Sequence, residues 1–341
     1  MEPTAEQLLR ELTGQDVRVV ARSELGSSAD APVTRLTLDR PYDGIGRTVI
    51  AKGRRLVDDA WGSSGLRDNE QRALEHLRDT GLAPRLLAGV PGGLTVMTDV
   101  GAPTVQELLF GDDPDAATRG LVAMAELAGT LHRTASANFT AAQEVSFLDR
   151  PLDLWPEVAQ AVDELGFPAP REVELDALAV ALQETTFTHG DFTPNNVVLT
   201  DRARMIDLEG AGRRHPGLDA ACLRLPFPQY GHWAVLPADV SAEMERAYRA
   251  ELDVDGDVLM ATGCATWAII RLARLRMIAS AQQGLVRRRT QIVQTLESAA
   301  EAAGVVYPVF GAWFAELADA MRLRWEEAQL PPRTFRCFSN Q

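Results

Sequence analysis

Lysine is almost missing from this chain of 341 residues, whose basic residues are 33 arginines and the single Lys52. A coding bias towards arginine accounts for the scarcity, but it does not account for the place at which one lysine remains. Cysteine is scarce too, and Cys222, Cys264 and Cys337 lie far apart without CxxC spacing. We therefore expect neither a disulfide framework nor a zinc site, and reduced thiols fit a cytoplasmic protein.

The chain also lacks the patterns of a secretory signal and of a membrane span. Its acidic N-terminus has no basic stretch and no apolar core, and its most apolar run, 258–273, is interrupted by Arg271 and is too short for a bilayer. The chain also has no excess of positive charge, since its formal net charge is −14. We thus expect no membrane or nucleic-acid partner. The acidity favours solubility, and it leaves open an acidic cleft for a cationic substrate.

Periodicity divides the chain into a small sheet-containing part and a larger helical part. Alternating and helical spacings in the first part predict strands at 17–22, 33–38, 48–52, 85–88 and 94–98 and helices at 4–13 and 66–79. The second part predicts helices at 104–110, 115–135, 171–185, 241–251, 258–281, 286–303 and 309–328, with short strands at 186–188, 197–199 and 204–207. We expect an N-terminal lobe at 1–98, a hinge at 99–103 and a C-terminal lobe at 104–341.

Three polar residues next to the short strands have the chemistry of phosphoryl transfer. Asp191 and Asn196 are five residues apart on one loop, and Asp207 follows an apolar strand. Phosphoryl transfer needs a carboxylate to orient the attacking hydroxyl and accept its proton, and it needs oxygen ligands for magnesium. A loop that folds back on itself can supply both. The alternative is a polar turn and an exposed strand end.

The run His189-Gly190-Asp191, with Asn196 five residues after Asp191 and with Asp207 further on, resembles the aminoglycoside phosphotransferase and choline kinase group. That group shares the protein-kinase-like fold, so the resemblance implies an α+β, bilobal protein with a small antiparallel sheet and a mainly helical C-lobe. It also implies Asp191 as catalytic base, Asn196 and Asp207 as Mg²⁺ ligands, and ATP or GTP as phosphate donor. No A-P-E segment follows Asp207, which favours a small-molecule kinase over a protein kinase.

The sole lysine is an independent test of that resemblance. A kinase lobe needs a lysine on its third strand to reach the α- and β-phosphates, and Lys52 ends the third predicted strand. Glu70 lies on the apolar face of the following helix, where a buried carboxylate needs a partner, so we assign it to Lys52. An exposed helix pair of Glu70 with Arg67 is the alternative.

Other nucleotide contacts follow only from position in the implied fold. The turn Gly26-Ser27-Ser28 is a candidate phosphate cover, although it is not a G-x-G-x-x-G loop and an ordinary hairpin turn competes. The backbone around the hinge, at Met97, Thr98, Asp99 and Val100, is the candidate adenine site.

Four residues are candidates near the substrate. Asp219 matches a family position that supports the catalytic loop, and an acid at a helix N-terminus is the alternative. His232, Trp233 and Trp267 are candidates for the wall of the substrate pocket, although tryptophans of helical proteins also fill the core.

The sequence predicts an ATP- and Mg²⁺-dependent phosphotransferase acting on a small-molecule hydroxyl. An aminoglycoside-like or other antibiotic is the preferred acceptor, and an amino alcohol, a sugar or a similar metabolite is the alternative. A pseudokinase that regulates a partner is a third possibility, against which the complete set of Lys52, Asp191, Asn196 and Asp207 argues. The sequence indicates no oligomeric state.

Overall fold

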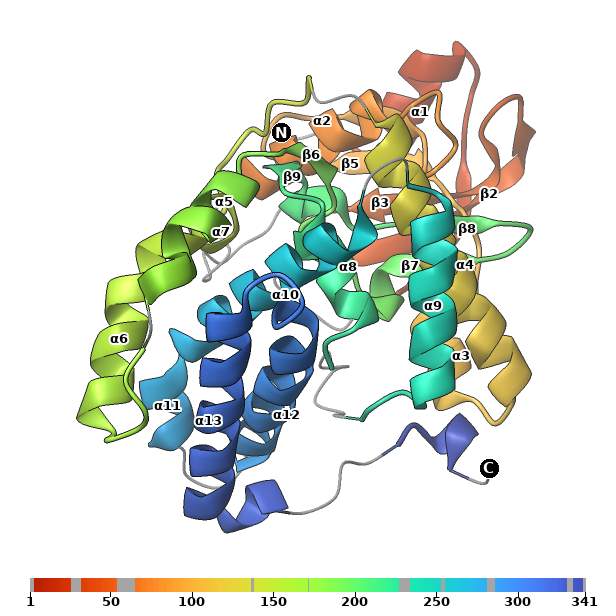
Figure 1. The fold of residues 1–341 in the computed structure, drawn as a ribbon. Coiled ribbons are helices and arrows are strands. Elements are labelled where there is room, and N and C mark those ends of the chain that lie inside the picture. The colour runs from red at the N-terminus through yellow and green to blue at the C-terminus, as the bar shows by residue number, and fades with distance from the viewer. Residues whose placement is uncertain are drawn as a thin grey trace.

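The computed structural model contains a sheet-rich N-terminal part and a larger helical part (Figure 1). It describes residues 3–25, 32–53, 65–135, 138–170, 172–226, 234–252, 255–280, 286–329 and 334–339. The predicted fold class, α+β with a small antiparallel sheet followed by a mainly helical remainder, is confirmed.

One antiparallel sheet of five strands, in the order β1-β2-β3-β5-β4, forms the N-terminal part. Its elements are α1 (Ala5–Thr13), β1 (Val19–Glu24), β2 (Val33–Tyr42), β3 (Gly46–Lys52), α2 (Gly65–His76), β4 (Leu86–Gly89) and β5 (Thr95–Thr98). Leu9 of α1 packs with buried sheet residues such as Val49 and Val96. The apolar side chains of α2, including Ala73 and Leu74, instead join the core of the helical part. This helix therefore connects the two parts.

Helices of 4 to 21 residues, most of them packed around one apolar core, form most of the remaining described chain (Figure 1). They are α3 (Val105–Phe110), α4 (Pro114–Thr134), α5 (Ser146–Asp149), α6 (Trp155–Glu164), α7 (Leu175–Ala181), α8 (Gly217–Ala220), α9 (Ala238–Ala250), α10 (Gly256–Leu272), α11 (Leu275–Ala279), α12 (Val286–Ala303) and α13 (Pro308–Arg324). Helix α4 packs on α9, and α12 packs on both α10 and α13. Aromatic side chains such as Phe310 and Trp313 fill the space inside this bundle.

Two short antiparallel ribbons lie between the sheet and the helices. One pairs β6 (Thr186–Thr188) with β9 (Gly212–Arg214), and the other pairs β7 (Val197–Leu199) with β8 (Ala203–Met205). The loops between these strands carry Asp191, Asn196 and Asp207. The ribbons thus bring residues that are far apart in sequence to one edge of the helical part.

A close backbone approach fixes α10 against α8. A Cβ on Gly263 would lie far closer than 3.0 Å to the carbonyl oxygen of Gly217, so only hydrogen fits there. The prediction of one helix over 258–281 is wrong, because the chain bends after Leu272 and continues as α11. This bend lets Leu275 and Ile278 become buried beside α6 and α12.

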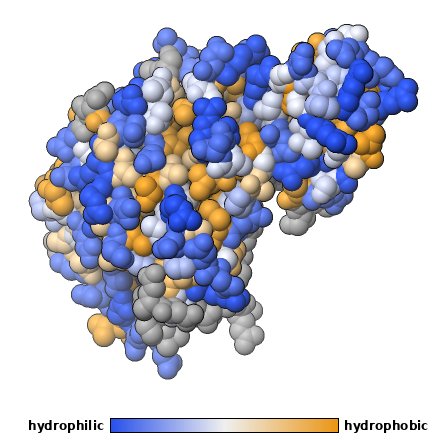
Figure 2. All heavy atoms as spheres, turned by 90° about the vertical axis from the view of Figure 1, so that its right-hand side faces the viewer, coloured by the Kyte–Doolittle hydropathy of each residue, from blue (hydrophilic) through white to orange (hydrophobic). Residues whose placement is uncertain are grey.

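The face of the molecule seen in Figure 2 is mostly hydrophilic, with apolar side chains on both the larger and the smaller part. Within the described ranges, no helix combines the length and the apolar character that crossing a membrane requires.

Candidate active site

Lys52 is the centre of a three-residue ion cluster between the sheet and the helical part. Its Nζ lies 2.5 Å from Glu70 Oε1 and 2.6 Å from Asp207 Oδ1. Lys52 is 6% exposed and Glu70 is fully buried. Because unpaired charges are costly to bury, the three side chains constrain one another. The cluster therefore joins the end of β3, the second turn of α2 and the loop after β8.

Asn69, next to Glu70 in sequence, anchors α2 to the same loop. Its Nδ2 donates to the carbonyl oxygens of Glu209 and Ala211 at 2.8 and 2.7 Å, and its Oδ1 accepts from the backbone N–H of Ala142 at 3.0 Å. The side chain is fully buried. Asn69 thus sets the distance between Glu70 and the segment that follows Asp207, a role that the sequence analysis missed.

The loop that carries Asp191 follows β6 and is shaped by His189 and Gly190. His189 Nε2 donates to the Ile206 carbonyl oxygen at 2.8 Å, and its Nδ1 accepts from the backbone N–H of Asp191 at 3.2 Å. Gly190 has φ 83°, and a Cβ there would overlap the carbonyl oxygen of Gly210. Glycine is therefore required before Asp191.

Asp219 of α8 accepts hydrogen bonds from the backbone of this loop. Its Oδ2 accepts from the backbone N–H of His189 at 2.6 Å and its Oδ1 from that of Gly190 at 2.9 Å. His132 lies 3.4 Å from Oδ2, and its other ring nitrogen bonds to the Tyr248 hydroxyl at 2.8 Å. Burial alone would raise the pKa of the Asp219 carboxyl, but the His132 and His189 contacts outweigh it and hold that pKa below its usual range. The carboxylate is buried against the loop and does not line the substrate cavity described below.

Asp191 and Asn196 contact each other at the opening of the loop. Asn196 Nδ2 donates to the backbone oxygen and to Oδ2 of Asp191 at 2.8 and 2.9 Å. The surrounding protein removes part of the hydration of the Asp191 carboxylate, which raises its pKa, and the charges of Asp207 and Asp219 act in the same direction. Asp191 still reaches solvent, because it lies at the wall of an open cavity.

Asn196 and Asp207 offer hard oxygen atoms of the kind that bind magnesium. Asn196 Oδ1 accepts one hydrogen bond, from Asn195 Nδ2 at 2.8 Å, which leaves a second lone pair. Asp207 has φ 63°, and 41% of its side chain is exposed while one oxygen contacts Lys52. In the part of the chain that the structure describes, no group of three or more His, Cys, Asp or Glu residues could hold a metal. Two protein ligands, completed by phosphate and water oxygens, suit Mg²⁺, so this pair fits the ion.

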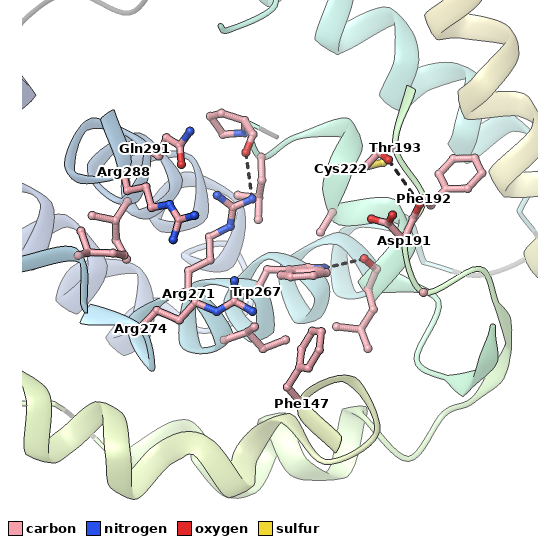
Figure 3. A pocket seen from close by; sticks show the side chains of 18 of the residues that line it. Phe147, Asp191, Phe192, Thr193, Cys222, Trp267, Arg271, Arg274, Arg288 and Gln291 are labelled. Atoms are coloured by element: carbon pink, nitrogen blue, oxygen red, sulfur yellow. Dashed lines mark hydrogen bonds between the residues drawn. The ribbon is translucent and has the colours of Figure 1, made fainter. Parts of the chain in front are cut away.

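A cavity of about 550 Å³ extends from Asp191 and Asp207 into the helical part (Figure 3). Trp267 lies in its wall, and its Nε1 donates to the Leu218 carbonyl oxygen at 2.7 Å. The cavity is further lined by Phe147, Gly190, Phe192, Thr193, Asn195, Leu218, Ala221, Cys222, Leu225, Pro226, Ile270, Arg271, Arg274, Met277, Ile278, Arg288, Gln291 and Ile292. The sequence analysis pointed to none of these arginines.

The remaining sequence-based candidates are placed only in part. Gly26, Ser27, Ser28, His232 and Trp233 lie outside the described residues.

The candidate adenine segment begins in β5. Met97 pairs with Ile50 of β3, and the Asp99 carboxylate forms an ion pair with Arg35 at 2.6 Å. The adenine-binding role of this segment stays a prediction. Thr98 Oγ1 accepts from the backbone N–H of Arg85 at 2.9 Å, and Val100 follows Asp99 outside any strand.

A five-stranded antiparallel sheet with an ion-paired lysine, joined to a helical part with an aspartate loop, defines a protein-kinase-like phosphotransferase. Residues 54–256 match the model of the phosphotransferase enzyme family termed APH, and the chain belongs to this family of small-molecule kinases.

Solved structures share the fold at low sequence identity. Choline kinase from Cryptosporidium parvum is 14% identical with a TM-score of 0.53, and the match covers 86% of this chain and 93% of that one. A Thermobifida fusca protein assigned as a fructosamine-3-kinase is 20% identical with a TM-score of 0.52, over 87% of this chain and 99% of that one. No curated protein matches the chain.

Proposed function

We propose that this small-molecule kinase transfers the γ-phosphate of ATP to a hydroxyl group with Asp191 as catalytic base. The single observation that supports the proposal most is the position of Asp191 and Asp207 in the wall of one cavity, with Lys52 bound to Asp207. The division into a nucleotide-binding lobe at 1–98, a hinge at 99–103 and a catalytic lobe at 104–341 is part of the proposal, as is a cytoplasmic location.

Each residue has a defined part in the proposed reaction. Lys52, held by Glu70, binds the α- and β-phosphates, while Asn196 and Asp207 hold Mg²⁺. The metal, when bound, neutralises charge on the phosphates. The acceptor oxygen forms a bond to the γ-phosphorus as the bond to the bridging β–γ oxygen breaks, ADP leaves, and the hydroxyl proton passes to Asp191.

The fold does not determine which molecule supplies the acceptor hydroxyl. The names of the two structural relatives, a choline kinase and a protein assigned as a fructosamine-3-kinase, favour a metabolite, whereas an aminoglycoside-like antibiotic is the preferred acceptor from sequence. These classes differ in charge and shape, so the residues that line the cavity are a better guide than fold.

The proposed chemistry is tested by ADP release with an acceptor panel and by calorimetric titration of ATP with and without Mg²⁺. Asp191→Ala is expected to lower kcat by roughly 10²–10⁴ while ATP still binds. Asp207→Ala is expected to abolish the Mg²⁺-dependent part of ATP affinity. Unchanged turnover in Asp191→Ala would remove Asp191 from the mechanism.

Two glutamates on α2 provide a matched control for the lysine. Glu70→Gln is expected to weaken ATP binding because Lys52 loses its buried partner, whereas Glu75→Gln alters an exposed ion pair with Arg78 and is expected to change nothing. Lys52→Arg keeps the charge but replaces a compact ammonium, so wild-type kinetics in that variant would contradict the role of Lys52.

A further inference from the structure

The end of the cavity away from Asp191 is cationic. Arg271 from the last turn of α10, Arg274 from the junction with α11 and Arg288 from the start of α12 line it, together with the amide of Gln291. Figure 3 shows these side chains on the opposite side of the cavity from Asp191. We refer to Arg271, Arg274 and Arg288 as the arginine cluster.

Carboxylates do not neutralise the exposed members of this cluster. Among the described residues, no Asp or Glu forms an ion pair with Arg274 or Arg288, whereas the nearby Arg276 and Arg289 each pair with a glutamate. Arg271 donates to two neutral oxygens, Thr295 Oγ1 at 3.2 Å and the Pro226 carbonyl at 3.4 Å.

Charge accumulates at this end although the chain as a whole is acidic. Burial lowers the pKa of Arg271 to about 10, and the charge of the neighbouring Arg274 acts in the same direction to a smaller extent. Asp191 and Asp207 are the acidic residues among the described residues that line the cavity, and Asp191 lies on the opposite side from the arginines (Figure 3). An anion between the arginines would relieve their repulsion and accept their forked N–H groups.

The wall between the two ends is apolar and fixed. The hydrogen bond from Trp267 to Leu218 and the close approach of Gly263 to Gly217 hold α10 against α8, whose Asp219 supports the Asp191 loop. Arg271 follows Trp267 by one helical turn, or about 6 Å of rise along α10, and Arg274 lies beyond the bend that follows Leu272. The separation between the catalytic carboxylate and the arginine cluster is therefore built into the packing.

We propose that the phosphate acceptor is an alcohol that carries a carboxylate or phosphate group, and that the arginine cluster binds this anionic group while the hydroxyl lies at Asp191. The inference rests on the proposed function. The body of the acceptor packs against Trp267 and Phe147. A polycationic acceptor is disfavoured, because its charges would meet the guanidinium groups of Arg274 and Arg288, which form no ion pair with a carboxylate among the described residues.

The test compares anionic acceptors with neutral partners of the same carbon skeleton, and with cationic acceptors. The full-length enzyme with Mg²⁺ and ATP is assayed for ADP release with hydroxy acids and their methyl esters, with sugar phosphates and their parent sugars, and with amino alcohols and aminoglycosides. We expect a hydroxy acid or a sugar phosphate to exceed its neutral partner at least about tenfold in kcat/KM, as a hydrogen-bonded charge requires. The two anionic arms distinguish a carboxylate from a phosphate.

Variants then test whether the arginine cluster causes the preference. Arg274→Gln and Arg288→Gln are each expected to raise KM for the preferred anionic acceptor about tenfold with kcat retained, and to raise KM for the neutral partner much less. Arg274→Lys should restore part of the loss. Arg47→Gln is the matched control, because Arg47 is an exposed arginine in β3 and its loss changes the net charge equally.

Each outcome decides either the inference or the proposed function. Faster turnover of neutral or cationic acceptors than of anionic ones would overturn the inference but not the proposed kinase function. A preference for anionic acceptors that persists in both glutamine variants would have the same consequence. Absence of ADP release from every acceptor, with ATP still bound, would overturn the proposed function. In that case calorimetric titration of the same compounds still tests the inference, because failure of the acids and phosphates to bind contradicts it.

Discussion

Replacing Asp219 with asparagine should disable the loop that carries Asp191 without touching the cavity. The carboxylate accepts backbone N–H groups on both of its oxygens, at 2.6 Å from His189 and at 2.9 Å from Gly190. Asparagine has nearly the same shape but one acceptor oxygen. In either orientation of the amide, one backbone N–H therefore faces an NH₂ group instead of an oxygen.

The magnitude follows from those two contacts. A hydrogen bond to a charged group contributes about 1.5–3 kcal/mol, and a buried donor left without an acceptor costs a further 1–3 kcal/mol or so. We expect Asp219→Asn to lower the free energy of unfolding by about 3–5 kcal/mol. Because the loop also loses its fixed geometry, kcat should fall between about tenfold and a hundredfold.

Denaturant titration and steady-state ADP release measure the two effects. Asp153→Asn is the matched control, since Asp153 lies 3.6 Å from Arg150 with both side chains exposed to solvent, and its substitution should alter neither quantity. An unfolding free energy within about 1 kcal/mol of wild type, together with unchanged kcat, would refute the idea that Asp219 holds the loop, because the lost charge-assisted bond alone exceeds that amount.

Three further predictions concern the framework of the site. Gly190→Ala should unfold the chain or abolish turnover, because its Cβ overlaps the Gly210 oxygen. Gly166→Ala is the control, because Gly166 also has a positive φ of 63° but has open space around the added Cβ. Equal melting temperatures of these two variants would contradict the steric argument. Asn69→Ala leaves two backbone carbonyls without their donor, so it should lower the free energy of unfolding, measured by denaturant titration, by about 2–4 kcal/mol. It should also weaken ATP binding. Wild-type ATP affinity in this variant would exclude coupling of Asn69 to the nucleotide site through α2. Burial lowers the pKa of His215 to about 4 from an ordinary value of 6.5. As the pH falls below 6.5, His215 takes up a proton in the unfolded chain before it does so in the folded chain. The free energy of unfolding therefore decreases as the pH falls from 6.5 towards 4. His215→Gln should remove up to about 3 kcal/mol of that pH dependence, and an identical pH profile of the melting temperature would show that the ring is not buried neutral.

The chemistry of the site was predictable because its residues carry their information locally. Lys52 ends a strand with a clear apolar pattern, and Asp191 and Asn196 have a fixed spacing on one loop. Glu70 could be assigned because it occupies the apolar face of a helix, where an acid needs a partner. These inferences require only the order of elements and the chemistry of the side chains, although the catalytic roles stay predictions.

The cationic end of the cavity could not be predicted in the same way. Arg271 and Arg274 looked like polar positions of one long helix, and Arg288 belongs to a different element. They meet only because α10 bends before α11 and packs on α12, and helical periodicity does not say which helix lies opposite. The net charge of −14 left an acidic cleft open, but a sum over the whole chain carries no information about one cavity.

Two omissions from the sequence analysis have different causes. Helix α6 had a usable signal, since Trp155, Val158 and Val162 follow helical spacing and all are buried. Asn69 had none, because a buried amide that binds two carbonyls looks like any polar helix residue until the opposite loop is known. The first omission was avoidable from the sequence, whereas the second depends on tertiary contacts.

The scarcity of lysine has a practical consequence for observing this enzyme. Since Lys52 is the sole lysine, incorporation of ¹⁵N-labelled lysine introduces one isotopically marked side-chain ammonium group into the entire polypeptide. Its buried position beside Glu70 and Asp207 should slow the exchange of its protons with water enough for a single, self-assigned resonance. That signal would report directly on nucleotide binding and on substitutions that alter the contacts of Lys52.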